Sequence, residues 1–190
     1  MKSFIARHNL YLLTALSAAA LLYTLVSWSS LPVPQRMVGL FSFALVLHLW
    51  EEGRFPGGFT AMITDKLGFA ARSPHFGEII TATYVLFIAF VPLLLPNVAF
   101  LAIAPMMLGI LEAIAHTAAI KMFDLKRFYS PGLITAGLLL LPLSLSAIIH
   151  TAQHDLLQPA EWLYAFLYML AGLALAQQIV VREAPVRNAL

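Results

Sequence analysis

Cysteine is absent from this chain of 190 residues, and its absence removes three kinds of chemistry at once. Without cysteine there can be no disulfide, no thiolate zinc site and no cysteine nucleophile. Histidine, carboxylate and hydroxyl side chains remain as the main groups for metal binding or covalent catalysis. A metal centre in this chain would therefore be built from nitrogen and oxygen ligands.

Charged side chains are also scarce, at 11% of the residues, whereas 61% of the residues are hydrophobic. Soluble domains carry about 25% charged residues, so this composition indicates a protein of the lipid bilayer. The net charge is only +2, and the basic residues are scattered rather than gathered in one patch. We therefore expect the bilayer, and no nucleic acid, as the macromolecular partner.

Long apolar runs recur along the chain, and a helix needs about 20 such residues to cross a bilayer. The first run is longer than the roughly 7 to 15 residues of a signal-peptide core, so we expect it to remain as a helix. The sequence predicts an all-α fold, a polytopic transmembrane helix bundle of about six spanning helices in a single domain, residues 1–190. The six runs cover residues 11–28, 37–50, 77–95, 98–120, 133–149 and 162–181.

The connection 53–76, between the second and third runs, is long enough to hold structure of its own. Apolar residues recur at helical spacing over residues 59–71, which predicts a short amphipathic helix in the membrane interface. We therefore expect a re-entrant or interfacial connection here.

Lysine and arginine indicate the orientation. Ten of the eleven basic residues fall on one side of the predicted bundle, and only Arg36 falls on the other. By the positive-inside rule, both termini and the long connections are expected in the cytoplasm, in an inner or plasma membrane. An even number of crossings agrees with this topology.

The second run ends in a polar cluster of His48, Glu51 and Glu52. The spacing i, i+3 and i+4 places the imidazole and both carboxylates on one helix face. A carboxylate in hydrocarbon costs roughly 2.5 to 3.5 kcal/mol, so two of them need a cation, a proton or a metal ion as a partner.

A second polar pair, Glu112 and His116, lies four residues apart near the cytoplasmic end of the fourth run. Intramembrane ionisable residues are functional candidates by default. Nitrogen and oxygen donors of this kind suit one or two divalent ions of zinc, iron or manganese. We predict His48, Glu51, Glu112 and His116 as metal ligands, with Glu52 as a general base or a further ligand.

Simpler interpretations compete with the metal site. The glutamates of residues 48–52 would instead reach solvent and pair with Arg54 or Lys66, and the pair on the fourth run would be hydrogen-bonded without a metal. His75 and Glu78, at the start of the third run, would be additional ligands, although an ordinary helix start accounts for them as well.

Another histidine pair, His150 and His154, follows the fifth run. Residues 133–150 rise about 26 Å as a helix, so this pair should lie near the outer face, away from the cluster. A surface pair is favoured over an external metal or proton-entry site.

The fifth run opens with Tyr129, Ser130, Pro131 and Gly132. Ser130 is a candidate N-cap with proline at the first helical position. The free N–H groups of a helix start attract anions, so Tyr129, Ser130 and Gly132 are candidates for binding a phosphate or carboxylate head group, with ordinary capping as the alternative.

These motifs together resemble the HXXEE-domain family of integral membrane proteins. The family motif stands here as HLWEE at residues 48–52, and the match covers roughly residues 37–150. The resemblance implies two further elements, Asn-x-x-x-His and Tyr-x-Pro-Gly, which correspond to residues 112–116 and 129–132. Glu112 replaces the asparagine; its oxygen can still ligate a metal, and it adds a negative charge. The resemblance supports a shared polar site but brings no established reaction.

The sequence thus favours a metal-dependent membrane enzyme, either a hydrolase or a di-metal oxidoreductase, acting on a lipid-like or membrane-soluble substrate near the cytoplasmic face. A transporter that uses the same cluster is the second hypothesis, although no internal repeat is evident and the cluster is off-centre. A structural or assembly protein, in which carboxylates pair with lysine or arginine, is the third.

Overall fold

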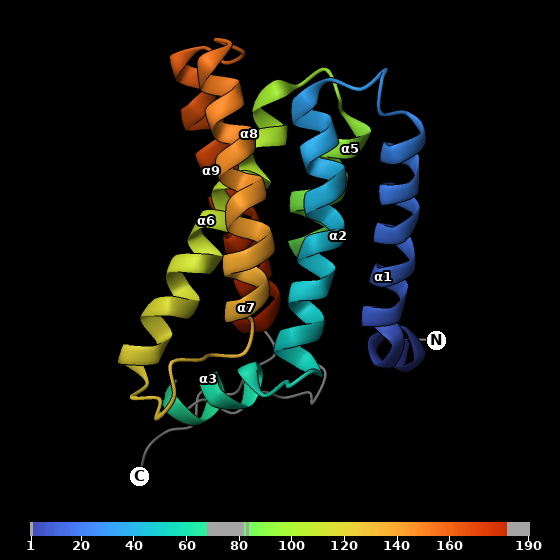
Figure 1. The fold of residues 1–190 in the computed structure, drawn as a ribbon. Helices are drawn as coiled ribbons and strands as arrows, with labels where there is room; N and C mark the ends of the chain where they lie inside the picture. Colours follow the sequence, from blue (N-terminus) through green and yellow to red (C-terminus); the bar gives the residue numbers. More distant parts are fainter. Residues whose placement is uncertain (1, 68–81, 83, 182–190) are drawn as a thin grey trace.

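The computed structural model describes residues 2–67, 82 and 84–181, and within these residues every regular element is a helix (Figure 1). Three elements in the second half, α7, η2 and α8, form one continuous helix over Leu133–Gln153. The elements are α1 (Lys2–Val26), α2 (Val33–Gly53), α3 (Phe59–Leu67), η1 (Leu86–Phe90), α5 (Val91–Leu94), α6 (Ala99–Met122), α7 (Leu133–Thr135), η2 (Ala136–Leu140), α8 (Leu141–Gln153) and α9 (Pro159–Val181). The all-α prediction is confirmed for these residues.

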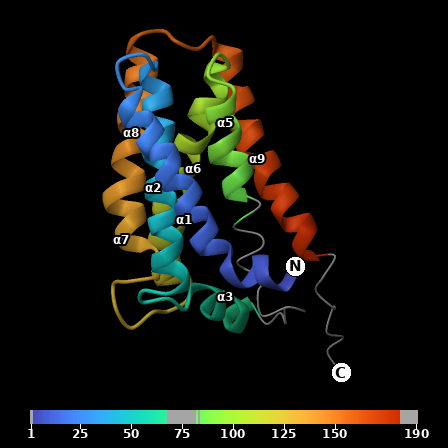
Figure 2. The same cartoon turned by 90° about the vertical axis from the view of Figure 1, so that its right-hand side faces the viewer.

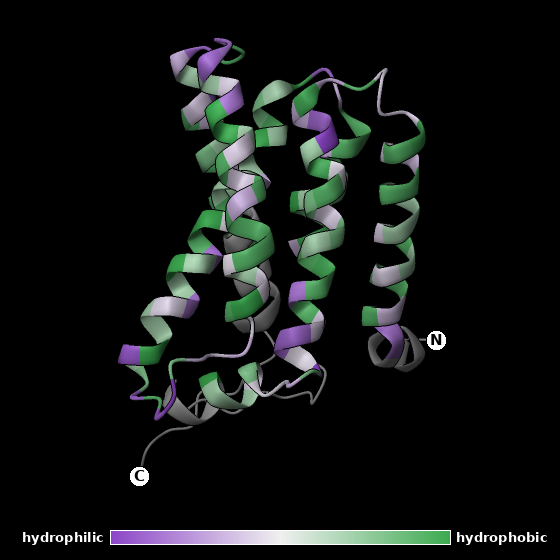
Figure 3. Cartoon of the chain, viewed as in Figure 1, coloured by the Kyte–Doolittle hydropathy of each residue, from purple (hydrophilic) through white to green (hydrophobic). Residues whose placement is uncertain are grey.

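Four helices are long and apolar enough to cross a membrane: His8–Val26, Val33–Gly53, Ala99–Met122 and Leu133–Gln153. They coincide with the first, second, fourth and fifth predicted runs. Figure 3 shows hydrophobic residues along most of each helix and hydrophilic residues mainly toward the ends. This pattern suggests a membrane protein.

The other two predicted spans are not confirmed. The third run, 77–95, begins outside the described residues, and its described part forms η1 and α5. The sixth run lies in α9, a helix of 23 residues that is not among the four candidate spans. Six crossings therefore stay a prediction.

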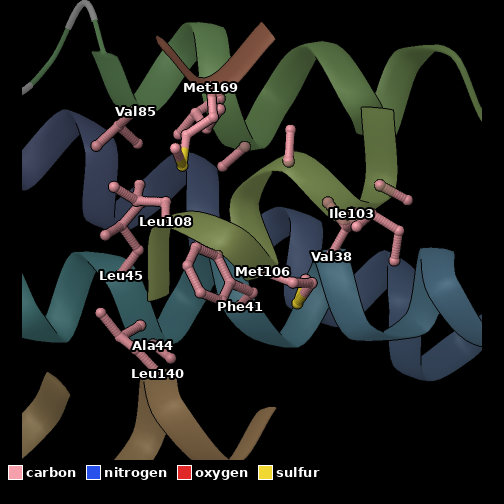
Figure 4. Packing of buried hydrophobic residues seen from close by; sticks show 14 of the residues in the cluster. Val38, Phe41, Ala44, Leu45, Val85, Ile103, Met106, Leu108, Leu140 and Met169 are labelled. Carbon is pink, nitrogen blue, oxygen red and sulfur yellow. The ribbon is translucent and has the colours of Figure 1, made fainter. Parts of the chain in front are cut away.

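Helix α2 stands at the centre of the bundle and contacts α1, α6 and α8. Its fully buried Val38 and Phe41 pack with Ile103 and Met106 of α6 and with Leu140 of η2 (Figure 4). Because lipid tails are as apolar as these side chains, van der Waals packing, rather than the hydrophobic effect, holds such helices together in a bilayer. The arrangement fixes α2, α6 and α8 against one another.

Gly109 allows a close contact between α6 and α8. A Cβ atom at this position would collide with the Ser144 hydroxyl and would lie 2.7 Å from Phe41 Cε2. Small residues of this kind let helix backbones approach in membranes. Gly109 therefore lets the two helices pack closely one turn before Glu112.

The helix Leu133–Gln153 contains a wider π turn, η2, which begins directly after Thr135. Pro142 follows at the second residue beyond this turn and cannot donate a backbone hydrogen bond. Wide turns of this type often occur at functional sites. Here the turn adjoins the residues that contact the polar cluster.

Helix α3 lies across one end of the bundle, near the ends of α2 and α6, in both views (Figures 1 and 2). Gly57 and Gly58, with φ of 76° and 96°, turn the chain from α2 into α3. A helix is thus present over Phe59–Leu67 of the predicted range 59–71, and the rest of that range lies outside the described residues. Its place in the membrane interface stays a prediction.

Candidate metal centre

The last turns of α2 carry the HLWEE motif, because the helix continues without a break to Gly53. His48 is only 1% exposed and Glu51 only 6% exposed. The helix therefore extends beyond the predicted run 37–50 and carries His48 and Glu51 into the interior of the bundle.

Helix α6 brings its own histidine and glutamate to the same place. The rings of His48 and His116 have centroids 4.9 Å apart and stand nearly perpendicular. His116 Nε2 lies 3.2 Å from Glu52 Oε1 and 3.6 Å from Glu112 Oε2. His48 Nε2 lies 3.7 Å and 3.8 Å from the same two oxygen atoms. Two nitrogen and two oxygen atoms therefore converge from two helices.

The hydrogen bonds of His48 define its protonation. Its Nδ1 lies 3.1 Å from the Gly132 carbonyl oxygen and 3.0 Å from the Thr135 hydroxyl oxygen. A carbonyl can only accept a hydrogen bond, so we assign the proton of the neutral ring to Nδ1. The lone pair on Nε2 then faces the two carboxylates.

His116 follows the same pattern. The Ser130 hydroxyl donates to the His116 carbonyl oxygen at 2.8 Å, so this hydroxyl accepts the bond from His116 Nδ1 at 3.2 Å. Among the residues that the structure describes, the buried Nε2 atom has no hydrogen-bond partner. An unpaired polar atom of this kind normally costs about 1 to 3 kcal/mol.

When both glutamates are ionised, acceptors therefore face acceptors at the centre of the cluster. Among the described residues, His48, Glu52 and His116 form a group whose ligand atoms all lie within 4.8 Å of one another and could hold a metal ion. Tetrahedral ligands with bonds of 2.0 to 2.2 Å stand about 3.3 to 3.6 Å apart. The nitrogen–oxygen distances, from 3.2 to 3.8 Å, are close to this separation.

Glu51 occupies a different position from the one predicted for it. Its carboxylate accepts hydrogen bonds from the Tyr129 hydroxyl at 3.0 Å, from the backbone N–H groups of Ile134 and Thr135 at 3.1 and 2.8 Å, and from the Thr135 hydroxyl at 2.5 Å. Its oxygen atoms are engaged with the start of α7. Glu52, predicted as a base or further ligand, stands with the histidines instead.

The anion-binding prediction for residues 129–132 has a related outcome. The start of α7 does bond a carboxylate, and that carboxylate is Glu51 from the same chain. Burial, followed by the hydrogen bond and charge of Glu51, raises the pKa of Tyr129 to about 12. Its hydroxyl therefore remains a donor at neutral pH.

Two residues of the site were missed in the sequence. Thr135 connects Glu51 to His48, and Phe59 of α3 places its ring 4.9 Å from that of His116. Thr135 lies three residues after Gly132, so a hydroxyl in the first helical turn was the available signal. Phe59 had no such signal beyond its place in the interfacial helix.

The remaining candidates do not join this cluster in the described structure. His75 and Glu78 lie outside the described residues. His150, which is half-buried, and His154, which is exposed, form a ring pair with centroids 4.1 Å apart and a hydrogen bond from His154 Nδ1 to the His150 carbonyl at 2.9 Å. Their position at the end of α8 agrees with the predicted surface pair.

Comparison with protein families gives one match, over residues 39–147, to the family described as "Protein of unknown function with HXXEE motif". Comparison with curated proteins and with solved structures gives no match. The matched range contains the polar residues that α2, α6 and α7 bring together.

Proposed function

The chain belongs to the HXXEE family, whose function is unknown. From the geometry of the polar site, we propose that the protein is a metal-dependent membrane enzyme. One observation carries the proposal. Two buried histidines hold their Nδ1 atoms in hydrogen bonds and direct both Nε2 lone pairs toward Glu52. A metal-ligating histidine characteristically donates its other ring N–H to a carbonyl, carboxylate or water in this way.

The ligand set favours one ion of zinc, iron or manganese held by His48, His116 and Glu52. Two histidines and one carboxylate form the ligand set of several zinc hydrolases. A divalent ion there would supply Lewis-acid polarisation of a carbonyl or phosphoryl oxygen and would acidify a water molecule. We therefore favour hydrolysis over oxidation.

Glu112 is our choice for the general base. Its side chain is the most exposed of the four groups, at 26% compared with 15% for Glu52 and 1 to 2% for the histidines. Its oxygen lies beside both Nε2 atoms, where it can accept a proton from water. Glu112 would then return that proton to the leaving group.

An aromatic cluster at the same end of α2 as the site supports a lipid-like substrate. The Trp50 ring lies 5.1 Å from the Tyr11 ring and stacks on Phe55 at 5.8 Å. Tryptophan and tyrosine are enriched where membrane meets water, and Trp50 stands two residues before Glu52. These rings support a position of the centre near the level of the lipid head groups, and an ester, amide or phosphoester of a membrane lipid is the substrate class we propose.

The proposed topology can be tested with single cysteines, since the natural chain has none. We expect Ser29→Cys and Gln158→Cys to react with a membrane-impermeant maleimide in intact cells. Lys126→Cys should react only after permeabilisation, because the positive-inside rule puts its loop in the cytoplasm. The reverse labelling pattern would contradict the proposed orientation.

Metal content is the direct test of the site. Protein purified in detergent should hold about one zinc, iron or manganese ion per chain, and His116→Ala or Glu52→Gln should lose it. His150→Ala is the matched control, because this histidine is at the opposite end of the bundle and should leave the metal content unchanged. A parent protein that takes up no metal, even after incubation with each ion, would refute the metal site.

Catalysis needs a separate assay. We expect protein in vesicles to hydrolyse a lipid ester, amide or phosphoester, to stop when a chelator removes the metal and to resume when the metal is restored. Glu112→Gln should keep the metal but lose turnover by about 10²- to 10⁴-fold, the range for a general base. Metal accumulation inside vesicles without hydrolysis would contradict the enzyme proposal and indicate a metal carrier.

A further inference from the structure

We propose that Glu51 is a positioning residue for the metal centre, acting on the ligand His48 through the Thr135 hydroxyl. The inference rests on the proposed metal function, because it concerns how one ligand is held. It gives the two adjacent glutamates of the motif different roles: Glu52 contributes a ligand atom, and Glu51 orients a ligand ring.

The direction of each hydrogen bond follows from the donors available. The Thr135 hydroxyl has one proton, and its 2.5 Å contact with Glu51 Oε2 is much shorter than its 3.2 Å contact with the Gly132 carbonyl. We therefore assign the proton to the bond with Glu51. The threonine oxygen is then free to accept from His48 Nδ1–H at 3.0 Å. A continuous chain runs from the imidazole through the hydroxyl to the carboxylate.

The carboxylate at the end of this chain is itself fixed. Tyr129 and the N–H group of Ile134 hold Oε1, while the N–H group of Thr135 holds Oε2 beside the hydroxyl. Because Glu51 is anchored to the start of α7, it fixes the rotation of the Thr135 hydroxyl and hence of the His48 ring. A negative charge behind the chain also makes Nε2 a stronger ligand.

The two histidines differ in this respect. His116 Nδ1–H donates to the Ser130 hydroxyl, and this hydroxyl donates to the backbone carbonyl of His116. These two hydrogen bonds involve no carboxylate. His48 has the carboxylate-backed chain as well as the Gly132 carbonyl. Loss of the chain should therefore change the His48 bond in particular.

Thr135→Val removes the hydroxyl while keeping the shape of the side chain, and Thr135→Ser restores it. We expect Thr135→Val to weaken Zn²⁺ binding about 10- to 100-fold, the range for outer-shell partners of metal ligands. Thr135→Ser should bind Zn²⁺ nearly as tightly as the parent. The visible absorption spectrum of bound Co²⁺ should change in the valine variant and be rescued by serine, which a loss of packing alone would not produce.

Thr24→Val is the matched control, since this buried threonine donates only to the Ala20 carbonyl of its own helix. It should leave Zn²⁺ affinity and the Co²⁺ spectrum unchanged. If Thr135→Val does not fold, we expect the same result from Thr135→Ala, because alanine also lacks the hydroxyl and keeps the backbone N–H bond to Glu51. A parent without metal would refute the proposed function, whereas a metal-binding parent matched by Thr135→Val in affinity and spectrum would refute only the positioning role.

Discussion

Gly132→Ala is expected to abolish metal binding, although it adds only a single uncharged methyl group. At this position φ is +104°, a left-handed conformation that residues with a Cβ rarely adopt. The added Cβ would lie 2.5 Å from His116 Cε1, 2.7 Å from His116 Nε2 and 2.8 Å from His48 Cε1. Both ligand rings would have to move, and the Gly132 carbonyl that receives His48 Nδ1–H would move with them.

Metal content per chain and Zn²⁺ titration measure this effect, and two glycines provide matched controls. Gly58→Ala shares a left-handed φ, +96°, but its Cβ would meet no atom of the described residues within 4 Å. Gly137→Ala has neither the special conformation nor, in the described part of the chain, a neighbour within 4 Å. Both controls should keep the metal, so loss in Gly132→Ala alone would assign the effect to contact with the histidines. Full metal binding by Gly132→Ala would contradict the arrangement of the rings.

Periodicity explains how much of this site could be predicted. The spacing of His48 and Glu52, like that of Glu112 and His116, puts each pair on one helix face, and helix direction puts both pairs at the same end of the bundle. These are local rules, so the pairs and their convergence could be predicted. The four candidate spans also depend only on length and composition.

The division of labour between Glu51 and Glu52 could not be predicted in this way. Adjacent helix residues point about 100° apart, so both lie within reach of the face that bears His48. Which one meets the metal position depends on where α6 and α7 pack around α2. That is a long-range property, and no local pattern in the motif specifies it.

The start of α7 shows the same limit from another side. Helix physics correctly indicates that its N–H groups attract an anion. The sequence alone could not identify Glu51, 83 and 84 positions away from the two N–H donors, as that anion. The polar motifs at residues 48–52, 112–116 and 129–132 thus meet through contacts that each motif by itself leaves undefined.

Substitutions of Glu51 and Glu52 should have opposite effects on the midpoint of thermal unfolding of the metal-free protein. The two carboxylate oxygen atoms of Glu51 accept four hydrogen bonds. In Glu51→Gln an amide NH₂ group replaces one of these oxygen atoms, and it cannot accept a bond from the donors that it faces. Bonds to charged groups contribute about 1.5 to 3 kcal/mol each. We therefore expect Glu51→Gln to lower the midpoint of thermal unfolding, with or without metal, by the equivalent of about 2 kcal/mol or more.

Glu52→Gln should do the opposite in metal-free protein. Glu52 faces the unpartnered Nε2 atom of His116 at 3.2 Å, so acceptor meets acceptor there unless a cation or a proton intervenes. A glutamine amide can donate to that nitrogen and should raise the unfolding midpoint by the equivalent of about 1 kcal/mol. Added Zn²⁺ at 100 times its Kd should stabilise the parent by about 2.7 kcal/mol and Glu52→Gln hardly at all. If both variants instead lowered metal-free stability alike and kept the response to Zn²⁺, the carboxylates would share one structural role, and the assignment of Glu52 as the ligand would be wrong.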